Sequence, residues 1–288
     1  MMKVLITGSR GFVGSRLAKS MGERCELLTP THGEFDITLL EAVRQYVHRH
    51  RPHCIVHLAA ISNTGYCEEH PEESYKVNVV GVENLAQVST EYGCKLVFFS
   101  SDQVYNGNLE MGLLSETAPV SPENHYGRHK LLAEQRALQL CPDCVALRAT
   151  WMYDVRREGM QTHNNFILNI KEAISQNNPL SFATREYRGI TWVNEVVCNT
   201  PHAIQLPGGV YNFGAENTLN TYETALAYLD MLQCEPQAIA IADEKRFPAH
   251  VRNISISMKK AVEASNGAIR FSDTIEGLRK FEKLTFGC

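Results

Sequence analysis

The sequence has no apolar stretch long enough to cross a lipid bilayer, because its longest apolar runs, such as residues 54–61, fall far short of the roughly 18–20 residues that a spanning helix needs. It also has no run of Lys or Arg longer than a pair, and 28 basic residues against 32 acidic ones give a formal charge of −4. A basic patch is the usual electrostatic sign of a nucleic-acid or anionic-membrane partner. We therefore expect neither nucleic acid nor a membrane as a partner.

The nine cysteines are odd in number and scattered, so they do not form a disulfide framework. The N-terminus lacks the charged start, long apolar core and small-residue cleavage site of a secretory signal. Both features favour a cytoplasmic protein. Cys141 and Cys144 lack the four ligands of a structural zinc site, and the histidines within 48–53 fall at the end of a predicted helix, where basic side chains favour the dipole. We predict no metal site.

Hydrophobic residues make up 44% of the chain and charged residues 21%, as in ordinary globular proteins. Five strand-like runs, each followed by a segment with helical spacing, lie at residues 4–6, 25–28, 54–58, 95–100 and 145–148. Nearly continuous apolar strands separated by amphipathic helices predict an α/β fold with a doubly wound parallel sheet. We expect the strand order to reverse between the first and fourth strands.

A glycine-rich turn, Thr7–Gly14, directly follows the first predicted strand. The first glycine allows a tight turn, the second lets backbone amides approach a pyrophosphate, and the third lets helix and strand pack closely. Glycine triplets also occur in ordinary loops, but a position between a strand and a helix favours dinucleotide binding. The predicted cofactor contacts are Gly8, Ser9, Arg10, Gly11, Phe12, Val13 and Gly14.

Beyond about residue 150 the alternation loosens, and prolines interrupt helical patterns at residues 164–176, 193–205, 222–233 and 257–265. We therefore divide the chain into a dinucleotide-binding Rossmann domain, residues 1–150, and a smaller substrate-binding lobe, residues 151–288. We expect the two to be interleaved.

The end of the second predicted strand has no acidic residue before Glu34. Rossmann folds selective for NAD usually carry one there to bind the ribose 2′-hydroxyl. Arg10 can instead meet the 2′-phosphate of NADP with a bidentate guanidinium, the alternative being a solvated loop arginine. NADP is the favoured cofactor, and NAD remains the alternative.

Tyr126 and Lys130 are four residues apart and therefore share one face of a predicted helix. The charge of Lys130 favours the tyrosinate, so we expect a Tyr126 pKa below the ordinary value of about 10 and a role as general acid. The spacing alone is also typical of a solvated helix surface. The catalytic interpretation is supported by Ser100-Ser101-Asp102-Gln103. This segment ends the fourth predicted strand, at the sheet edge where ligands bind in open α/β folds.

In this order the motifs resemble an extended short-chain dehydrogenase/reductase: the glycine turn, Leu58-Ala59-Ala60, Asn78, Ser100-Ser101-Asp102 and Tyr126-x-x-x-Lys130. Residues 101–107, 147–153, 164–166 and 209–213 further resemble the dTDP-4-dehydrorhamnose reductase branch. The resemblance covers almost the whole chain. It implies NADPH-dependent reduction of a keto-sugar nucleotide, with Tyr126 as proton donor, Lys130 on the nicotinamide ribose and Ser101 positioning the carbonyl. It also implies cofactor contacts from Asp36, Ile37, Leu58, Ala59, Ala60, Asn78, Ser100 and Lys130.

The substrate side departs from that branch. Gly65-Tyr66 stands where members of that branch tend to carry an acid and a base, so Glu68 is the one charged residue of that substrate-side patch that remains. Residues 188–191 also lack the proline that is usual in the branch. Trp151 is either a substrate contact or a core aromatic residue. The candidate substrate residues are Ser62, Glu68, Asp102, Gln103, Trp151, Asn165 and Arg188.

The sequence supports three hypotheses about function. The leading hypothesis is a reductase of a keto-sugar nucleotide, whose exact identity the sequence does not determine. An epimerase or dehydratase on the same fold is the nearest enzyme alternative, and a non-catalytic dinucleotide-binding regulatory subunit is the alternative of another class. The oligomeric state is open as well, with a homodimer included.

Overall fold

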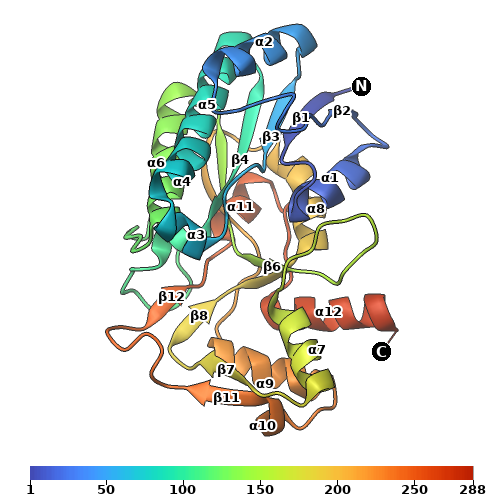
Figure 1. Cartoon of the computed structure of the whole chain (residues 1–288), viewed down its shortest axis with the longest axis vertical. Helices are drawn as coiled ribbons and strands as arrows, with labels where there is room; N and C mark the ends of the chain where they lie inside the picture. Colours follow the sequence, from blue (N-terminus) through green and yellow to red (C-terminus); the bar gives the residue numbers. More distant parts are fainter. Residues whose placement is uncertain (288) are drawn as a thin grey trace.

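A computed structural model gives the structure of residues 1–287, which is built on a six-stranded parallel sheet (Figure 1). The order of the strands is β10-β5-β4-β3-β1-β2. Their bounds are β1 Lys3–Thr7, β2 Glu26–Leu28, β3 Cys54–His57, β4 Lys95–Ser101, β5 Val145–Ala149 and β10 Gly209–Phe213. The α/β fold with a parallel sheet, expected from the alternating apolar runs, is confirmed.

The strand order corrects one detail of that expectation. β3 pairs directly with β1, with Val4 opposite Cys54, so the order reverses between the first and third strands and not between the first and fourth. The chain passes from β2 over β1 to reach β3, and β4 then adds outside β3. The carboxyl ends of β1, β3 and β4 therefore lie side by side at the edge that carries the predicted motifs.

Helices cover both faces of the sheet. Helices α1 (Phe12–Met21) and α8 (Val193–Ala203) pack on one face, whereas α2 (Leu40–His50), α5 (Gly81–Tyr92) and α6 (His125–Leu140) pack on the other. Successive strand residues point to opposite faces, so Ile6 and Val97 join the first core and Leu5 and Phe98 the second. Within residues 1–287, no helix is both long and apolar enough to pass through a bilayer.

Short helices shape the carboxyl edge of the sheet. These are α3 (Thr64–Glu69), α4 (Pro71–Tyr75), the π-helix η1 (Lys76–Val80) and the 3₁₀-helix η2 (Asp102–Tyr105). The first three follow β3, and η2 follows β4 without a gap.

The rest of the chain forms a lobe below this edge in Figure 1. Its apolar core includes Phe166, Tyr228 and Phe281. Its elements are β6 (Trp151–Tyr153), α7 (Phe166–Gln176), β7 (Leu180–Ala183), β8 (Glu186–Arg188), β9 (Ile190–Trp192), α9 (Thr221–Met231), α10 (Pro236–Ile239), β11 (Ala240–Asp243), β12 (Arg252–Ile254) and α12 (Thr274–Phe286). From the same half of the chain, α8 and β10 return to the sheet, and α11 (Lys259–Ala264) packs against β10.

A buried ion pair ties the lobe to the sheet. Arg16 of α1 donates from Nε to Asp154 Oδ2 at 2.7 Å, just after β6. The same guanidinium donates to the Gln161 carbonyl at 3.1 Å, so it also holds the loop that leads to α7. Both charged groups are withdrawn from water, so loss of Asp154 would leave Arg16 as an uncompensated buried charge. Loss of Arg16 would leave Asp154 with the half-exposed Arg157 as its remaining partner, 3.0 Å away.

Candidate active site

The turn after β1 has the geometry of a phosphate cradle. Gly8 has φ +68°, and a Cβ atom there would lie 2.6 Å from the Ala59 nitrogen. A Cβ at Gly14 would lie 2.1 Å from the Gly8 carbonyl oxygen, so only glycine fits where α1 crosses the turn. Gly11 caps α1 without a side-chain hydrogen bond, which leaves the first amides of the helix available to an anion. These features fit the pyrophosphate of a dinucleotide.

The end of β3 is fixed against this turn. Thr7 Oγ1 accepts hydrogen bonds from the amides of Leu58 and Ala59, both at 3.3 Å, and its one proton is left for His57 Nδ1, 2.6 Å away. Leu58, Ala59 and Ala60 are half-buried.

Asn78 fixes the backbone a little further along. Its amide accepts from the Ile61 nitrogen at 2.9 Å and donates to the Ile61 carbonyl at 2.8 Å. The expected direct cofactor contact by Asn78 therefore needs correction, because the side chain is 1% exposed and these bonds occupy both ends of its amide.

A cavity of about 760 Å³ adjoins the glycine turn, lined in part by Ser9, Arg10, Thr29 and residues 159–161. Arg10 lines this cavity together with Thr29, the residue that follows β2. The pKa of Glu34 is lowered mainly by hydrogen bonds from Thr31, with a smaller contribution from the charge of Arg10. The Arg10 guanidinium is exposed at this cavity.

Asp36 and Ile37, two of the expected cofactor contacts, lie beside α5. Asp36 Oδ1 accepts from the amide and the hydroxyl of Thr38, at 2.9 and 2.7 Å, and so shapes its own turn. Ile37 is 7% exposed and packs on Gly81, where a Cβ would come within 2.7 Å of its Cδ1 atom. The Ile37 side chain therefore belongs mainly to the core.

Tyr126 and Ser101 meet because α6 starts close to η2. Asn124 caps α6 by accepting from the Gly127 amide at 2.7 Å, and a Cβ at Gly127 would lie 2.6 Å from the Gln103 carbonyl. The glycine permits this approach, which brings Tyr126 close enough to Ser101 for the serine to affect the pKa of the tyrosine. Both side chains are nearly buried, at 8% and 7% exposure.

Lys130 lies one helical turn after Tyr126. Its Nζ donates to the Phe99 carbonyl at 2.8 Å and lies 5.8 Å from the centre of the Tyr126 ring. Burial lowers the pKa of Lys130 to about 8, against the opposing charge of Glu134.

The pKa of Tyr126 is raised, and the expected decrease is wrong. Burial is the main cause, opposed by the hydrogen bond with Ser101 and reinforced by the charge of Asp102. Burial raises the pKa because the tyrosinate would lose its hydration in this site. A tyrosine that keeps its proton at neutral pH is suited to donate it.

Sequence reasoning missed Glu134, one further turn along α6. Its carboxylate accepts from Ser100 Oγ at 2.5 Å and pairs with Arg148, whose Nη2 is 2.8 Å from Oε2. Arg148 in turn donates to the Tyr105 hydroxyl at 2.6 Å. Ser100 therefore serves this buried network, in place of the direct cofactor contact expected of it. The repeat of Tyr126, Lys130 and Glu134 at intervals of four was the available signal.

Four of the seven predicted substrate residues come together beside the Ser101–Tyr126 pair. Asp102 and Gln103 begin η2. Arg188 Nη2 lies 3.5 Å from Asp102 Oδ2, and the guanidinium carbon of Arg188 lies over the Trp151 ring, 4.9 Å from its centroid. Glu68 reaches the start of α6, where its Oε1 accepts from the His125 amide at 2.5 Å. Ser62, in the segment between β3 and α3, is exposed.

Asn165 does not join this group. It is fully buried, caps α7 by accepting from the Leu168 amide at 3.3 Å, and donates to the carbonyls of Asp154 and His163. The expectation of a substrate contact is corrected for this reason, since the cap and the loop use the whole amide.

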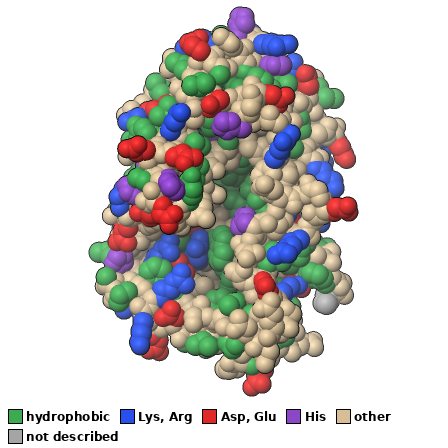
Figure 2. All heavy atoms as spheres, viewed as in Figure 1, with side chains coloured by type: hydrophobic (Ala, Val, Ile, Leu, Met, Phe, Trp, Pro, Cys, Tyr) green, Lys and Arg blue, Asp and Glu red, His purple; other side chains and the backbone are tan. Residues whose placement is uncertain are grey.

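Figure 2 shows a cleft down the middle of the face viewed, with hydrophobic side chains on its floor and Lys or Arg side chains beside its lower end. No group of three or more His, Cys, Asp or Glu side chains among residues 1–287 is arranged to hold a metal ion.

A parallel sheet with a glycine turn after its first strand, and a Ser101, Tyr126, Lys130 set at its carboxyl edge, define an oxidoreductase of the extended short-chain dehydrogenase/reductase type. The family model described as the RmlD substrate binding domain matches residues 2–270, and the chain belongs to this family.

Named relatives agree with this assignment. The chain is 26% identical to a dTDP-4-dehydrorhamnose reductase of Aggregatibacter actinomycetemcomitans, over 92% of this chain and 93% of the relative. It is 29% identical to a dTDP-4-keto-6-deoxy-D-glucose reductase of Streptomyces niveus, over 81% and 79%. The crystal structure of a dTDP-4-dehydrorhamnose reductase from Bacillus anthracis, in complex with NADP, has the same fold, with a TM-score of 0.84, 23% identity and coverage of 99% and 100%.

Proposed function

We propose that the protein reduces the carbonyl group of a keto-sugar nucleotide with NADPH. The observation that carries the proposal is the Tyr126 hydroxyl, which lies beside Ser101 at the sheet edge, one helical turn before Lys130 and next to the dinucleotide cradle. Burial raises the pKa of Tyr126 and so favours the protonated form. The names of the relatives support a nucleotide-linked 4-keto sugar as the substrate class.

Each end of the cofactor has residues to hold it. The amides at the start of α1 suit the pyrophosphate, Arg10 suits the 2′-phosphate, and Lys130 suits the nicotinamide ribose. The nicotinamide, when bound, supplies the hydride for the carbonyl carbon. NADP is preferred to NAD because the end of β2 offers Arg10, while the carboxylate of Glu34 is engaged by Thr31.

The chain's own groups manage the proton. The hydroxyl of Ser101 donates to Asp102 Oδ1 at 3.2 Å without substrate, and rotation of this hydroxyl would let it donate to the substrate carbonyl oxygen instead. Tyr126 would then protonate that oxygen as it gains charge. The ammonium group of Lys130 then stabilises the tyrosinate that remains. A cytoplasmic location and the absence of a nucleic-acid partner are proposed from the charge and cysteine pattern of the sequence alone. The oligomeric state is open, and a homodimer is included among the candidates.

A kinetic experiment tests the proposal. The protein is incubated with NADPH and a panel of keto-sugar nucleotides while the absorbance of NADPH is followed. Wild type should consume one NADPH for each sugar reduced. Tyr126→Phe should lower kcat by about 10²–10⁴-fold, the usual contribution of a general acid, and leave the Kd for NADPH within about threefold. Tyr92→Phe, at the far end of α5, is the matched control.

Other outcomes identify the alternatives. Conversion of the sugar without net loss of NADPH would indicate an epimerase or dehydratase, because these return the cofactor to its starting state. Tight NADPH binding without turnover of any sugar in the panel would indicate a regulatory subunit. Near-wild-type kcat in Tyr126→Phe would exclude Tyr126 as the acid.

A further inference from the structure

The segment between β6 and α7, residues 154–165, lies against α1; in Figure 1 it is the yellow-green loop to the right of β6. Arg16 of α1 donates from Nη1 to the Gln161 carbonyl at 3.1 Å. The rings of Phe12 and His163 pack edge to face, with their centroids 4.6 Å apart. Because Phe12 begins α1, these contacts hold the β6–α7 segment beside the glycine turn.

The cavity of about 760 Å³ beside the glycine turn is lined by two distant parts of the chain. Ser9, Arg10 and Thr29 line it from the turn and from the end of β2, and residues 159–161 line it from the β6–α7 segment. Cavities of about 300–1,000 Å³ are typical of sites for small molecules and cofactors. The β6–α7 segment therefore contributes to the ligand site that this cavity offers.

The polar groups of this cavity suit a phosphate. Within residues 1–287, Arg10 is the only charged residue that lines it, and Ser9, Ser15 and Thr29 add hydroxyl groups that can donate. A guanidinium can bind a phosphate through two parallel hydrogen bonds. In a Rossmann fold the ribose next to the adenine binds at the end of the second strand, and Thr29 directly follows β2. The phosphate group expected at this place is the 2′-phosphate of NADPH.

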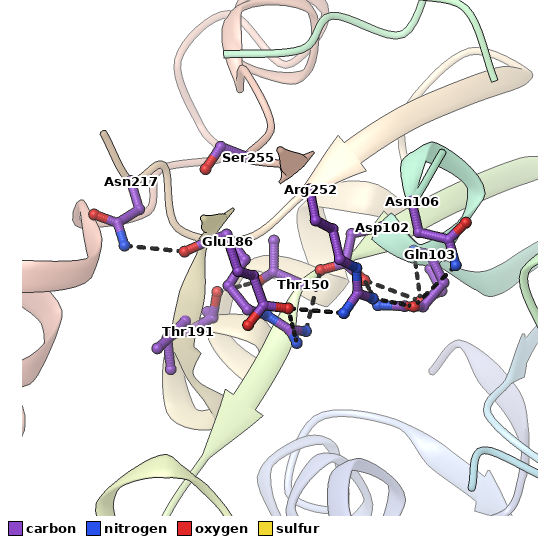
Figure 3. A network of polar contacts seen from close by, with 12 residues as sticks. Asp102, Gln103, Asn106, Thr150, Glu186, Thr191, Asn217, Arg252 and Ser255 are labelled. Carbon is purple, nitrogen blue, oxygen red and sulfur yellow. Dashed lines mark hydrogen bonds and ion pairs between the residues drawn. The ribbon is translucent and has the colours of Figure 1, made fainter. Parts of the chain in front are cut away.

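The arginines at the lobe end of the cleft are already paired with carboxylates. Arg252 donates to Glu186 Oε1 at 2.7 Å (Figure 3), and Arg188 Nη2 lies 3.5 Å from Asp102 Oδ2. Arg10, by contrast, forms no hydrogen bond and no ion pair with any of residues 1–287. Its guanidinium can therefore bind a phosphate without first breaking an internal pair.

Gln161 is the residue of the β6–α7 segment that can add a hydrogen bond to this phosphate. Arg16 engages its carbonyl, whereas its side chain is exposed and its amide forms no hydrogen bond within residues 1–287. An amide group offers two N–H donors. Of its neighbours in the lining, Met160 offers a sulfur that only accepts weakly, and Gly159 has no side chain.

We infer that Gln161 binds the 2′-phosphate of NADPH together with Arg10, so that the β6–α7 segment takes part in the choice between NADPH and NADH. The contacts of Arg16 and Phe12 with the segment keep Gln161 at the cavity. The inference rests on the proposed function, because it assumes that the glycine turn binds the dinucleotide.

The test measures the Kd for NADPH and for NADH by fluorescence titration in wild type and in two variants. Gln161→Glu places a carboxylate beside both the phosphate and Arg10, so the Kd for NADPH should rise at least about tenfold while that for NADH stays within about threefold. Gln161→Ala removes only the donor and should raise the Kd for NADPH about three- to tenfold. Adenosine 2′,5′-bisphosphate carries the 2′-phosphate without the nicotinamide, and it should lose affinity by the same factors.

Gln205→Glu is the matched control, because it adds the same charge at an exposed position that lines a separate cavity with Lys95, where β4 begins. It should leave both Kd values unchanged. An unchanged Kd for NADPH in Gln161→Glu, or equal weakening of NADPH and NADH, would overturn the inference and leave the proposed function standing. Wild type that binds neither dinucleotide would overturn the proposed function itself.

Discussion

Lys130 should make the stability of the folded protein depend on pH in a defined direction. Burial lowers its pKa from 10.5 to about 8 in the folded chain, and unfolding restores the ordinary value. The difference corresponds to about 3 kcal/mol. Between pH 8 and 10.5 the unfolded chain holds a proton that the folded chain has lost, so the free energy of unfolding rises with pH across this window. Below pH 8 the cost of burying the charge is present in full.

Lys130→Met removes this titration while it fills much of the same space. We expect the free energy of unfolding of wild type minus that of Lys130→Met to increase by roughly 2–3 kcal/mol between pH 7 and pH 10. Urea unfolding at four pH values measures it, and the exposed Lys19→Met serves as control, with a difference from wild type that stays constant. A flat difference for Lys130→Met would refute the buried-lysine reasoning.

Three further changes test the cofactor end and the lobe contact. Gly14→Ala places a methyl group against the Gly8 carbonyl and should raise the Kd for NADPH at least about tenfold in a fluorescence titration. An unchanged Kd would contradict the role of the glycine turn in binding the pyrophosphate. Arg10→Met should weaken NADPH by at least about tenfold and leave NADH unchanged, whereas equal weakening of both would count against a 2′-phosphate contact. Arg16→Met leaves Asp154 buried with a weaker partner and should lower the free energy of unfolding by about 3 kcal/mol in urea, a value near zero being the contrary result.

Local patterns were enough to predict the elements of the fold. The strands at 4–6 and 95–100 are recognisable because buried parallel strands are apolar on both faces, and the glycine turn because Gly8 needs a positive φ. The strand order was not recognisable in the same way. Whether β3 lies beside β1 depends on a pairing between distant segments, which local periodicity does not encode.

In the candidate site, too, local sequence patterns predict some features, and others depend on the folded structure. The spacing of Tyr126 and Lys130 predicts that they share a helix face, but it does not reveal that both become buried, and burial decides the direction of the Tyr126 pKa. Arg252 was missed because its partner Glu186 is 66 residues away, in a segment with no recognisable motif. Residues that bind through long-range pairs need the folded structure to be found.

The central claim is net transfer of hydrogen from NADPH to the sugar carbonyl with a proton from Tyr126. The most direct measurement uses NADPH that carries deuterium at the transferable position of its nicotinamide, with a nucleotide-linked 4-keto sugar, and follows the product by NMR. The account predicts one deuterium on the former carbonyl carbon for each NADPH oxidised, and no labelled product with Tyr126→Phe on the same time scale. A product without deuterium, or with the label retained in the cofactor, would contradict it.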